Sequence, residues 1–133
     1  MEQRVTMIGL GVNDLQVAAD FYDNKFGWSR TAASTADIIF YQLPGAALLS
    51  LYGRKALAED ATVDDTGSGF KGFTMAYNTR SEKEVDELIE ELRAKGVKIV
   101  KEPQKVFWGG YSSYIADADD NLWEIAFNPY LIP

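Results

Sequence analysis

The chain has no histidine and no cysteine. Without cysteine there are no disulfides, no thiolate chemistry and no cysteine metal sites. Without histidine the commonest general base and the commonest protein metal ligand are missing. The two absences exclude a Ser-His-Asp triad, a histidine-based zinc site and a 2-His-1-carboxylate iron site.

Positive charge and long apolar runs are scarce as well. Thirteen Lys and Arg stand against 20 Asp and Glu, and the net charge of −7 argues against nucleic acid or an anionic membrane as the main partner. No apolar run approaches the ~20 residues of a membrane span. The N-terminal sequence Met1-Glu2-Gln3-Arg4 has no signal-peptide pattern, so we expect a cytoplasmic protein.

Hydrophobic residues are plentiful, at 47% of 133 residues, and aromatic residues make up 13%. This composition predicts a globular chain with a real core, and we expect residues 1–133 to form a single domain.

The first half, residues 4–54, predicts a βαβββ module. An apolar strand over Arg4–Val12 precedes a helix that Asn13 or Asp14 caps and Gly27 ends. Pro44-Gly45 is typical of a hairpin turn between the last two strands. The strands expected after the helix are Trp28–Ser34, Asp37–Leu43 and Ala46–Tyr52.

Residues 55–69 differ in composition, because they are small, charged and glycine-rich. We interpret them as a linker with one short helical turn at Lys55–Asp60.

The second half, residues 70–133, predicts the same order of elements. Ser81 and Glu84 form a capping box at the start of a helix that Gly96 ends. The strand candidates are Phe70–Thr79, Val97–Val100, Lys105–Trp108, Tyr111–Ala116 and Leu122–Phe127. We interpret this half as a second βαβββ module.

The two halves are weak copies of one unit. The segment around Met7 matches the segment around Thr74 at an offset of 67 residues, and Ser50 matches Glu124 at an offset of 74. Since neither half alone could bury its sheet, we expect the two sheets to pair around a shared pocket.

The last two predicted strands flank an acidic turn, Asp117–Asn121, and form a hairpin. Glu124 is the one charge in the apolar run after the turn, on either a solvated face or the wall of a polar cavity. A three-residue loop would place Tyr114 opposite Glu124, whereas a two- or four-residue loop would place Ser113 there. Calcium is not expected, because the EF-hand pattern needs Glu at position 128, which is Asn.

These features together resemble the vicinal oxygen chelate superfamily, which includes glyoxalase I, bleomycin-resistance proteins and extradiol dioxygenases. Three stretches carry the resemblance and cover both modules: Val5–Trp28, Phe73–Tyr77 and Tyr114–Ile125. The resemblance implies an α+β fold of two tandem βαβββ modules whose paired, curved sheets form a cleft.

In metal-dependent members of this superfamily, four positions at the cleft hold the metal. The resemblance places them here at Met7, Ser50, Thr74 and Glu124, of which only Glu124 is a ligand-type residue. The closing turn also departs from the family pattern, with Ala118 and Asp120 in place of the usual proline and glycine. One carboxylate with two hydroxyls is a poor site for Zn²⁺, Ni²⁺ or Fe²⁺, so we expect no metal and no cofactor.

The favoured function is metal-free binding of a small aromatic or amphipathic molecule, as in bleomycin-resistance proteins. The alternative is a lyase, isomerase or hydrolase that uses Glu124 as general base, with a tyrosine or a backbone N–H replacing the metal. A dioxygenase is disfavoured by the missing histidines, and nothing in the sequence is specific to a purely structural or regulatory domain. The candidate ligand-binding residues are Met7, Ser50, Tyr52, Thr74, Trp108, Ser112 and Tyr114.

Each candidate also has a purely structural interpretation. Met7 and Tyr114 would be ordinary core residues, and Trp108 would be strand-end packing rather than an aromatic wall on a Gly-Gly joint. Glu124 would face solvent on an edge strand. The family resemblance and the apolar tail Pro129–Pro133 predict a homodimer.

Overall fold

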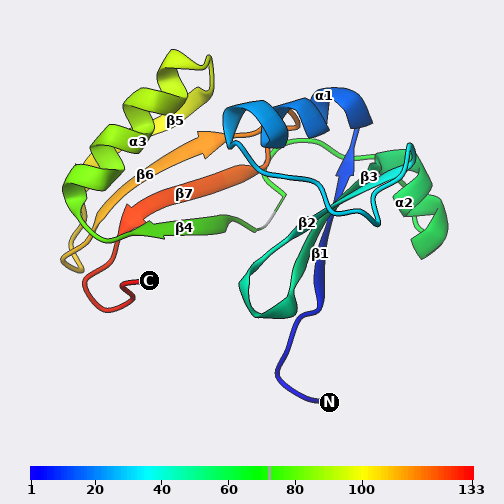
Figure 1. Ribbon diagram of the computed structural model, residues 1–133, viewed down its shortest axis with the longest axis horizontal. Coiled ribbons are helices and arrows are strands. Elements are labelled where there is room, and N and C mark those ends of the chain that lie inside the picture. The colour runs from blue at the N-terminus through cyan, green and yellow to red at the C-terminus, as the bar shows by residue number, and fades with distance from the viewer. Residues whose placement is uncertain (72) are drawn as a thin grey trace. The chain divides into compact units, whose positions relative to one another are not determined.

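The computed structural model describes residues 1–71 and 73–133, which form two compact units, Met1–Gly67 and Ser68–Pro133 (Figure 1). The first unit contains a three-stranded sheet and the second a four-stranded sheet, and both also contain helices. The expected α+β class is therefore confirmed. Among the described residues, no helix is both long enough and apolar enough to cross a membrane.

The first unit follows the predicted order, with one strand missing. Its sheet has the order β1-β3-β2, with β1 parallel and β2 antiparallel to the central strand β3. Its elements are β1 (Met7–Val12), α1 (Leu15–Asp20), the π-helix η1 (Phe21–Lys25), β2 (Ile38–Gln42), the 3₁₀ turn η2 (Pro44–Ala46), β3 (Leu48–Gly53) and α2 (Arg54–Ala61).

Local signals set the ends of these elements. Asp14, one of the two predicted caps, accepts hydrogen bonds from the backbone N–H groups of Gln16 and Val17, both at 3.0 Å. These bonds satisfy donors that the first turn of α1 leaves without partners. Gly27 follows the helix with a φ of 72°, and Gly45 makes the β2–β3 connection with a φ of 75°, in the left-handed region where glycine is favoured.

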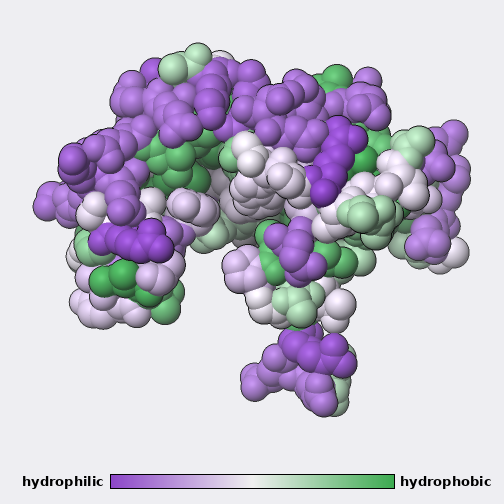
Figure 2. Space-filling model, viewed as in Figure 1, coloured by the Kyte–Doolittle hydropathy of each residue, from purple (hydrophilic) through white to green (hydrophobic). Residues whose placement is uncertain are grey.

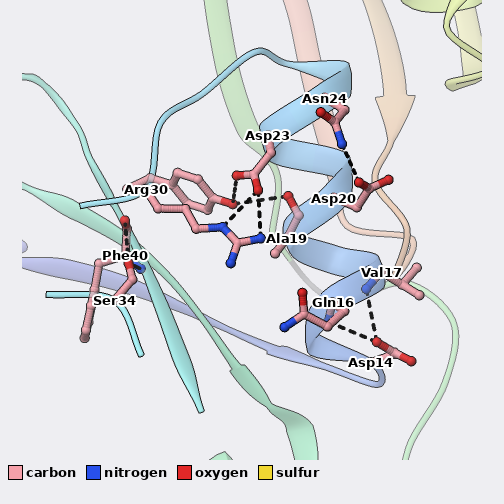
Figure 3. A network of polar contacts seen from close by, with 11 residues as sticks. Asp14, Gln16, Val17, Ala19, Asp20, Asp23, Asn24, Arg30, Ser34 and Phe40 are labelled. Carbon is pink, nitrogen blue, oxygen red and sulfur yellow. Dashed lines mark hydrogen bonds and ion pairs between the residues drawn. The ribbon is translucent and has the colours of Figure 1, made fainter. Parts of the chain in front are cut away.

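The strand predicted over Trp28–Ser34 is wrong, because only an isolated bridge between Arg30 and Tyr41 forms there. The side chain of Ser34 hydrogen-bonds the backbone of β2 where a neighbouring strand would pair. Its hydroxyl accepts from Phe40 N–H at 2.9 Å and donates to Phe40 C=O at 3.4 Å (Figure 3). A side-chain bond of this kind competes with regular backbone pairing and ends it.

The helical turn expected within residues 55–69 exists but is longer, because α2 runs over eight residues. It packs on the same side of the sheet as Gly11, where an added Cβ would lie 3.2 Å from the Cα of Arg54. A glycine on β1 therefore permits this close approach.

The opposite face of the first sheet carries the core. Leu10, Val12, Ile39, Leu49 and Leu51 are buried, together with Ala18 and Ala19 of α1. An aromatic cluster continues this core, with neighbouring ring centroids 5.1–5.8 Å apart; it comprises Phe21, Tyr22, Phe26, Trp28 and Tyr41.

A polar network joins β2 to the helical segment at this cluster (Figure 3). The buried Tyr41 hydroxyl donates to a carboxylate oxygen of Asp23 at 2.8 Å. Arg30 pairs with the second oxygen of that carboxylate, at 2.9 Å from Nε. The Asp23 carboxylate thus ties together η1, the irregular segment after it and β2.

The second unit has the sheet order β4-β7-β6-β5, with β4 parallel to β7 and the other pairs antiparallel. Its elements are β4 (Met75–Thr79), α3 (Glu82–Ala94), β5 (Lys98–Lys105), β6 (Tyr111–Ala116) and β7 (Leu122–Phe127). The bounds of β6 and β7 match the prediction. The strand predicted over Phe70–Thr79 includes Gly72, which lies outside the described residues, and its described strand is β4.

Helix α3 covers one face of this sheet (Figure 1). Its buried stripe, Val85, Ile89 and Leu92, lies on the same side as Ile115 and Ile125, while its outward side is hydrophilic (Figure 2). The predicted capping box forms, since Ser81 Oγ accepts from Glu84 N–H at 3.2 Å. The Glu84 carboxylate reaches back to the N–H of Arg80, one residue earlier than in the usual box.

Within residues 97–108 the structure has one strand, not the two that the sequence predicts. Strand β5 is continuous from Lys98 to Lys105, with register shifts on both sides of Lys101. Val106–Gly110 then makes the turn into β6, closed by hydrogen bonds from Val106 N–H to Gly110 C=O and from Gly109 N–H to Val106 C=O, both 3.0 Å.

The strand registers confirm the internal repeat. In the first unit Gly9 pairs with Ser50 across the parallel strands β1 and β3. In the second unit Ala76 pairs with Glu124 across β4 and β7. The offsets of 67 and 74 residues map one pair onto the other, so Ser50 and Glu124 occupy equivalent places in the two sheets.

The Tyr41 network predicts a stability difference that depends on pH. Burial, and then the bond to Asp23, raise the pKa of the Tyr41 hydroxyl well above its ordinary value of 10.0. The stabilisation that this hydroxyl gives the folded state is therefore complete below pH 10. It is lost as the pH rises further, because Tyr41 ionises in the unfolded chain at a lower pH than in the folded one. Tyr41→Phe should cost about 1.5–3 kcal/mol at pH 8, the range for a hydrogen bond to a charged group, and about 1.4 kcal/mol less than that at pH 11.

Urea denaturation of the wild type and the variant at both pH values measures this difference. Tyr77→Phe is the matched control, since Tyr77 is exposed, and it should change stability little at either pH. An equal Tyr41→Phe cost at pH 8 and pH 11 would contradict the assignment.

Candidate ligand-binding site

The face of the second sheet opposite α3 carries the candidate site. Side chains alternate along a strand, so residues paired across neighbouring strands share a face. Ala76 pairs with Glu124, Glu124 with Tyr114, and Tyr114 with Lys101, which makes one row across all four strands. Below, this surface is called the Glu124 face.

Glu124 is held by a second polar residue on this face. Ser112 lies two residues before Tyr114 on β6, and its hydroxyl donates to Glu124 Oε1 at 2.8 Å. Ser112 is buried, whereas Glu124 is only partly exposed. Among the described residues, Ser112 is the one hydrogen-bond donor to the Glu124 carboxylate, which leaves Oε2 open to a ligand.

Tyr114 lies directly opposite Glu124, as the three-residue loop predicts. Burial, and then the negative charge of Glu124, raise the pKa of the Tyr114 hydroxyl above its ordinary value. The phenol is therefore neutral at physiological pH and retains a proton that it can donate. Tyr114 is half-buried, so its side chain is neither fully buried in the core nor fully exposed to solvent.

The hairpin turn fixes this register through Asp117. Its backbone N–H donates to Asn121 C=O at 3.0 Å, and its Oδ1 accepts from the N–H groups of Asp119 and Asn121 at 2.9 and 2.8 Å. Asp120 takes the left-handed conformation, with a φ of 60°, where the family pattern has glycine. The buried Asp117 carboxylate is thus engaged in hydrogen bonds within the turn.

Trp108 lies in the β5–β6 turn and not on a strand. Its ring covers Gly110 so closely that an added Cβ there would lie 1.9 Å from a ring carbon. Phe107 beside it is fully exposed. The ring of Trp108 is therefore packed on its own turn.

The other predicted site residues belong to other elements. Met7, Ser50 and Tyr52 belong to the unit Met1–Gly67, on the face of its sheet opposite α1. Met7 is exposed, so it is not a core residue, while Ser50 is buried and Tyr52 half-buried. Thr74 is exposed just before β4 in the second unit.

Lys101 was missed by the sequence reasoning. Its ammonium nitrogen lies 6.0 Å from the centroid of the Tyr114 ring, on the Glu124 face. Strict alternation from Ile99 would have placed Lys101 on Ile99's side of the sheet, because Ile99 pairs with Ile115 on the α3 side. No sequence signal marks the irregular register that moves it.

The donor set does not fit a transition metal. Among the described residues, no three acidic, histidine or cysteine side chains are close enough to hold one. On the Glu124 face the carboxylate is accompanied by the hydroxyl of Ser112, which donates to it. Zn²⁺, Ni²⁺ and Fe²⁺ sites require several nitrogen, thiolate or carboxylate donors.

Comparison with known proteins gives a consistent result. Residues 4–125 match the family described as the Glyoxalase/Bleomycin resistance protein/Dioxygenase superfamily. The solved structure of a glyoxalase-related enzyme from Fulvimarina pelagi is 39% identical, with a TM-score of 0.84 over 96% of this chain and 90% of that one. No curated protein matches the chain.

Two further solved structures are similar at the level of the fold. A glyoxalase/bleomycin resistance protein/dioxygenase from Nocardioides is 23% identical, with a TM-score of 0.80 over 96% of this chain and 84% of that one. A lactoylglutathione lyase from Agrobacterium tumefaciens is 21% identical, with a TM-score of 0.74 over 98% of this chain and 97% of that one.

The donor set predicts the metal content of the purified protein. After dialysis, elemental analysis should find far less than one Zn, Ni, Mn or Fe per chain, because a single carboxylate cannot retain such an ion. The Glu124→Gln variant is the control and should give the same result. About one ion per wild-type chain, lost in Glu124→Gln, would overturn the prediction.

Proposed function

Because the chain belongs to the Glyoxalase/Bleomycin resistance protein/Dioxygenase superfamily, we propose that it binds a small aromatic or amphipathic molecule on the Glu124 face without a metal. The observation that carries this proposal is the Ser112–Glu124 hydrogen bond beside the half-buried Tyr114 ring. Ligand sites typically combine apolar and aromatic surface with a few well-placed polar groups.

Each residue has a separate role in this proposal. Tyr114 offers its ring to the flat part of the ligand and its neutral hydroxyl as a donor. Glu124 accepts an N–H or O–H of the ligand through Oε2, while Ser112 holds the other oxygen and so fixes the carboxylate orientation. Met7, Ser50, Tyr52, Thr74 and Trp108 remain predicted ligand contacts, to be tested by single alanine substitutions.

A second candidate function is catalysis of the lyase, isomerase or hydrolase type, with Glu124 as general base. The solved relative with 39% identity is described as a glyoxalase-related enzyme. The open Oε2 would abstract a proton from the substrate, and the Tyr114 hydroxyl would stabilise the oxyanion that forms, in place of a metal.

Replacing Glu124 separates the two functions. Glu124→Gln keeps the shape and the acceptance of the Ser112 bond but removes the charge. If the protein only binds, affinity for the aromatic amines, phenols and amides found in a thermal-shift screen should fall by about 1.5–3 kcal/mol, the value of a hydrogen bond to a charged group. If it is an enzyme, turnover should fall by about 10²–10⁴-fold or more while binding survives.

The screen should include glyoxalase, epimerase and hydrolase substrates, with turnover measured on the wild type first. Glu87→Gln on the exposed side of α3 is the matched control and should change neither quantity. Unchanged binding and unchanged turnover in Glu124→Gln would reject both functions.

We also propose that the protein is a homodimer. The apolar tail Pro129–Pro133 exposes the side chains of Leu131 and Ile132, and hydrophobic colour marks this end of the chain in Figure 2. The tail is attached to the sheet, since Asn78 donates to Leu131 C=O at 3.2 Å. Apolar residues held in a defined position on the surface are typical of an interface.

The dimer prediction is tested on the tail. Light scattering of the wild type at micromolar concentration should give twice the chain mass of 14.8 kDa. Leu131→Glu with Ile132→Glu should give the single-chain mass, because two charges would have to be buried in the interface. Val63→Glu, at another exposed apolar residue, is the control and should remain dimeric. A wild type of single-chain mass would contradict the proposal.

A further inference from the structure

The position of Lys101 depends on an irregularity in β5. Ile99 pairs with Ile115, and Lys101 pairs with Tyr114, so one extra residue, Val100, enters β5 between two consecutive positions of β6. Such a bulge re-aims the side chains that follow it. In a regular ladder Val100 would lie opposite Tyr114, and the Glu124 face would carry an apolar residue where it now carries a cation.

The charge of Lys101 is not used by the fold. Strand β5 has three lysines, and the outer two are paired: Lys98 with Asp120 at 3.6 Å and Lys105 with Glu82 at 3.4 Å. In the described part of the chain Lys101 makes no ion pair, and its ammonium lies over the Tyr114 ring. At 6.0 Å from the centroid, that contact is at the outer limit for a cation–π interaction.

We propose that Lys101 determines ligand specificity by pairing with an acidic group of the ligand. This inference rests on the proposed binding function of the Glu124 face and adds the chemical class of the ligand. Glu124 and Lys101 lie on either side of Tyr114, one strand away in each direction. With strands about 4.8 Å apart, their Cα atoms are separated by about 10 Å.

This row of charges selects a dipolar ligand. A donor or cationic group of the ligand lies at Glu124, an aromatic ring lies over Tyr114, and a carboxylate or similar acid lies at Lys101. A ligand with only the ring and the donor leaves Lys101 unused, and a ligand with only the ring and the acid leaves Glu124 unpaired. The ligand class is therefore a small aromatic molecule that carries a basic or donor group at one end and an acid at the other.

Three related probes test this assignment. Para-(aminomethyl)benzoate carries both charged ends, benzylamine carries only the cation, and benzoate carries only the acid. Affinities of the full chain for the three probes, at millimolar concentrations, are measured by NMR titration. The wild type should bind para-(aminomethyl)benzoate more tightly than either of the other two.

The variants then assign each end. Lys101→Met keeps most of the side-chain length and should weaken para-(aminomethyl)benzoate and benzoate about tenfold, the effect of losing a charged hydrogen bond, without changing benzylamine. Lys98→Met, on the same strand, is the matched control and should change none of the three affinities. Glu124→Gln should weaken para-(aminomethyl)benzoate and benzylamine but not benzoate.

The possible outcomes distinguish the two proposals. If Glu124→Gln weakens benzylamine but Lys101→Met leaves benzoate and para-(aminomethyl)benzoate unchanged, the role of Lys101 is rejected and the binding function stands. If no probe binds, or no affinity depends on Glu124 or Lys101, both are rejected. Circular dichroism of each variant shows whether a loss of binding is a loss of folding, and Lys101→Gln is a second variant for this purpose. If Lys101→Met is unfolded while Lys101→Gln is folded and binds all three probes as the wild type does, the role of Lys101 is also rejected.

Discussion

The β6–β7 turn is the constraint on which the candidate site depends. Asp117 accepts two backbone N–H groups and closes the loop onto Asn121, which sets the loop at three residues. Because side chains alternate with a period of two, a loop one residue shorter or longer would turn Tyr114 toward α3 and bring Ser113 or Ile115, respectively, opposite Glu124. The buried carboxylate of Asp117 in the turn thus determines that Tyr114 lies opposite Glu124.

Elements that follow from side-chain periodicity and capping residues could be predicted from the sequence. The bounds of β6 and β7 and the caps of α1 and α3 were all predictable. The prediction was wrong where a side chain or an extra residue replaces regular pairing: the Ser34 hydroxyl beside Phe40, and the bulges in β5. Neither leaves a periodic trace, and for this reason the pairing of Tyr114 with Glu124 could be predicted as one of two registers, whereas the position of Lys101 could not be predicted.

The repeat shows that this fold specifies backbone pairing and leaves the chemistry of the face open. Gly9↔Ser50 and Ala76↔Glu124 are the same pairing in two sheets, with a small residue on the first strand and a polar one on the last. The family pattern has metal ligands at Ser50 and Glu124, and here one of the two is a buried hydroxyl. Membership of the superfamily therefore establishes the fold, while function must be argued from the residues on the face.

The two faces of the second sheet differ in burial, which explains how changes of residue type on the Glu124 face are tolerated. Burial against α3 is provided by Ile115, Ile125 and the stripe of Ile89, all fully or almost fully buried. On the Glu124 face, Glu124 and Tyr114 are only partly buried, so their polar groups carry a lower desolvation cost than they would beneath the helix. The bulge at Val100 follows the same logic, because without it the ammonium of Lys101 would lie on the α3 side, opposite Ser113. The same irregularity thus spares the core a buried charge and places that charge on the face where a ligand can use it.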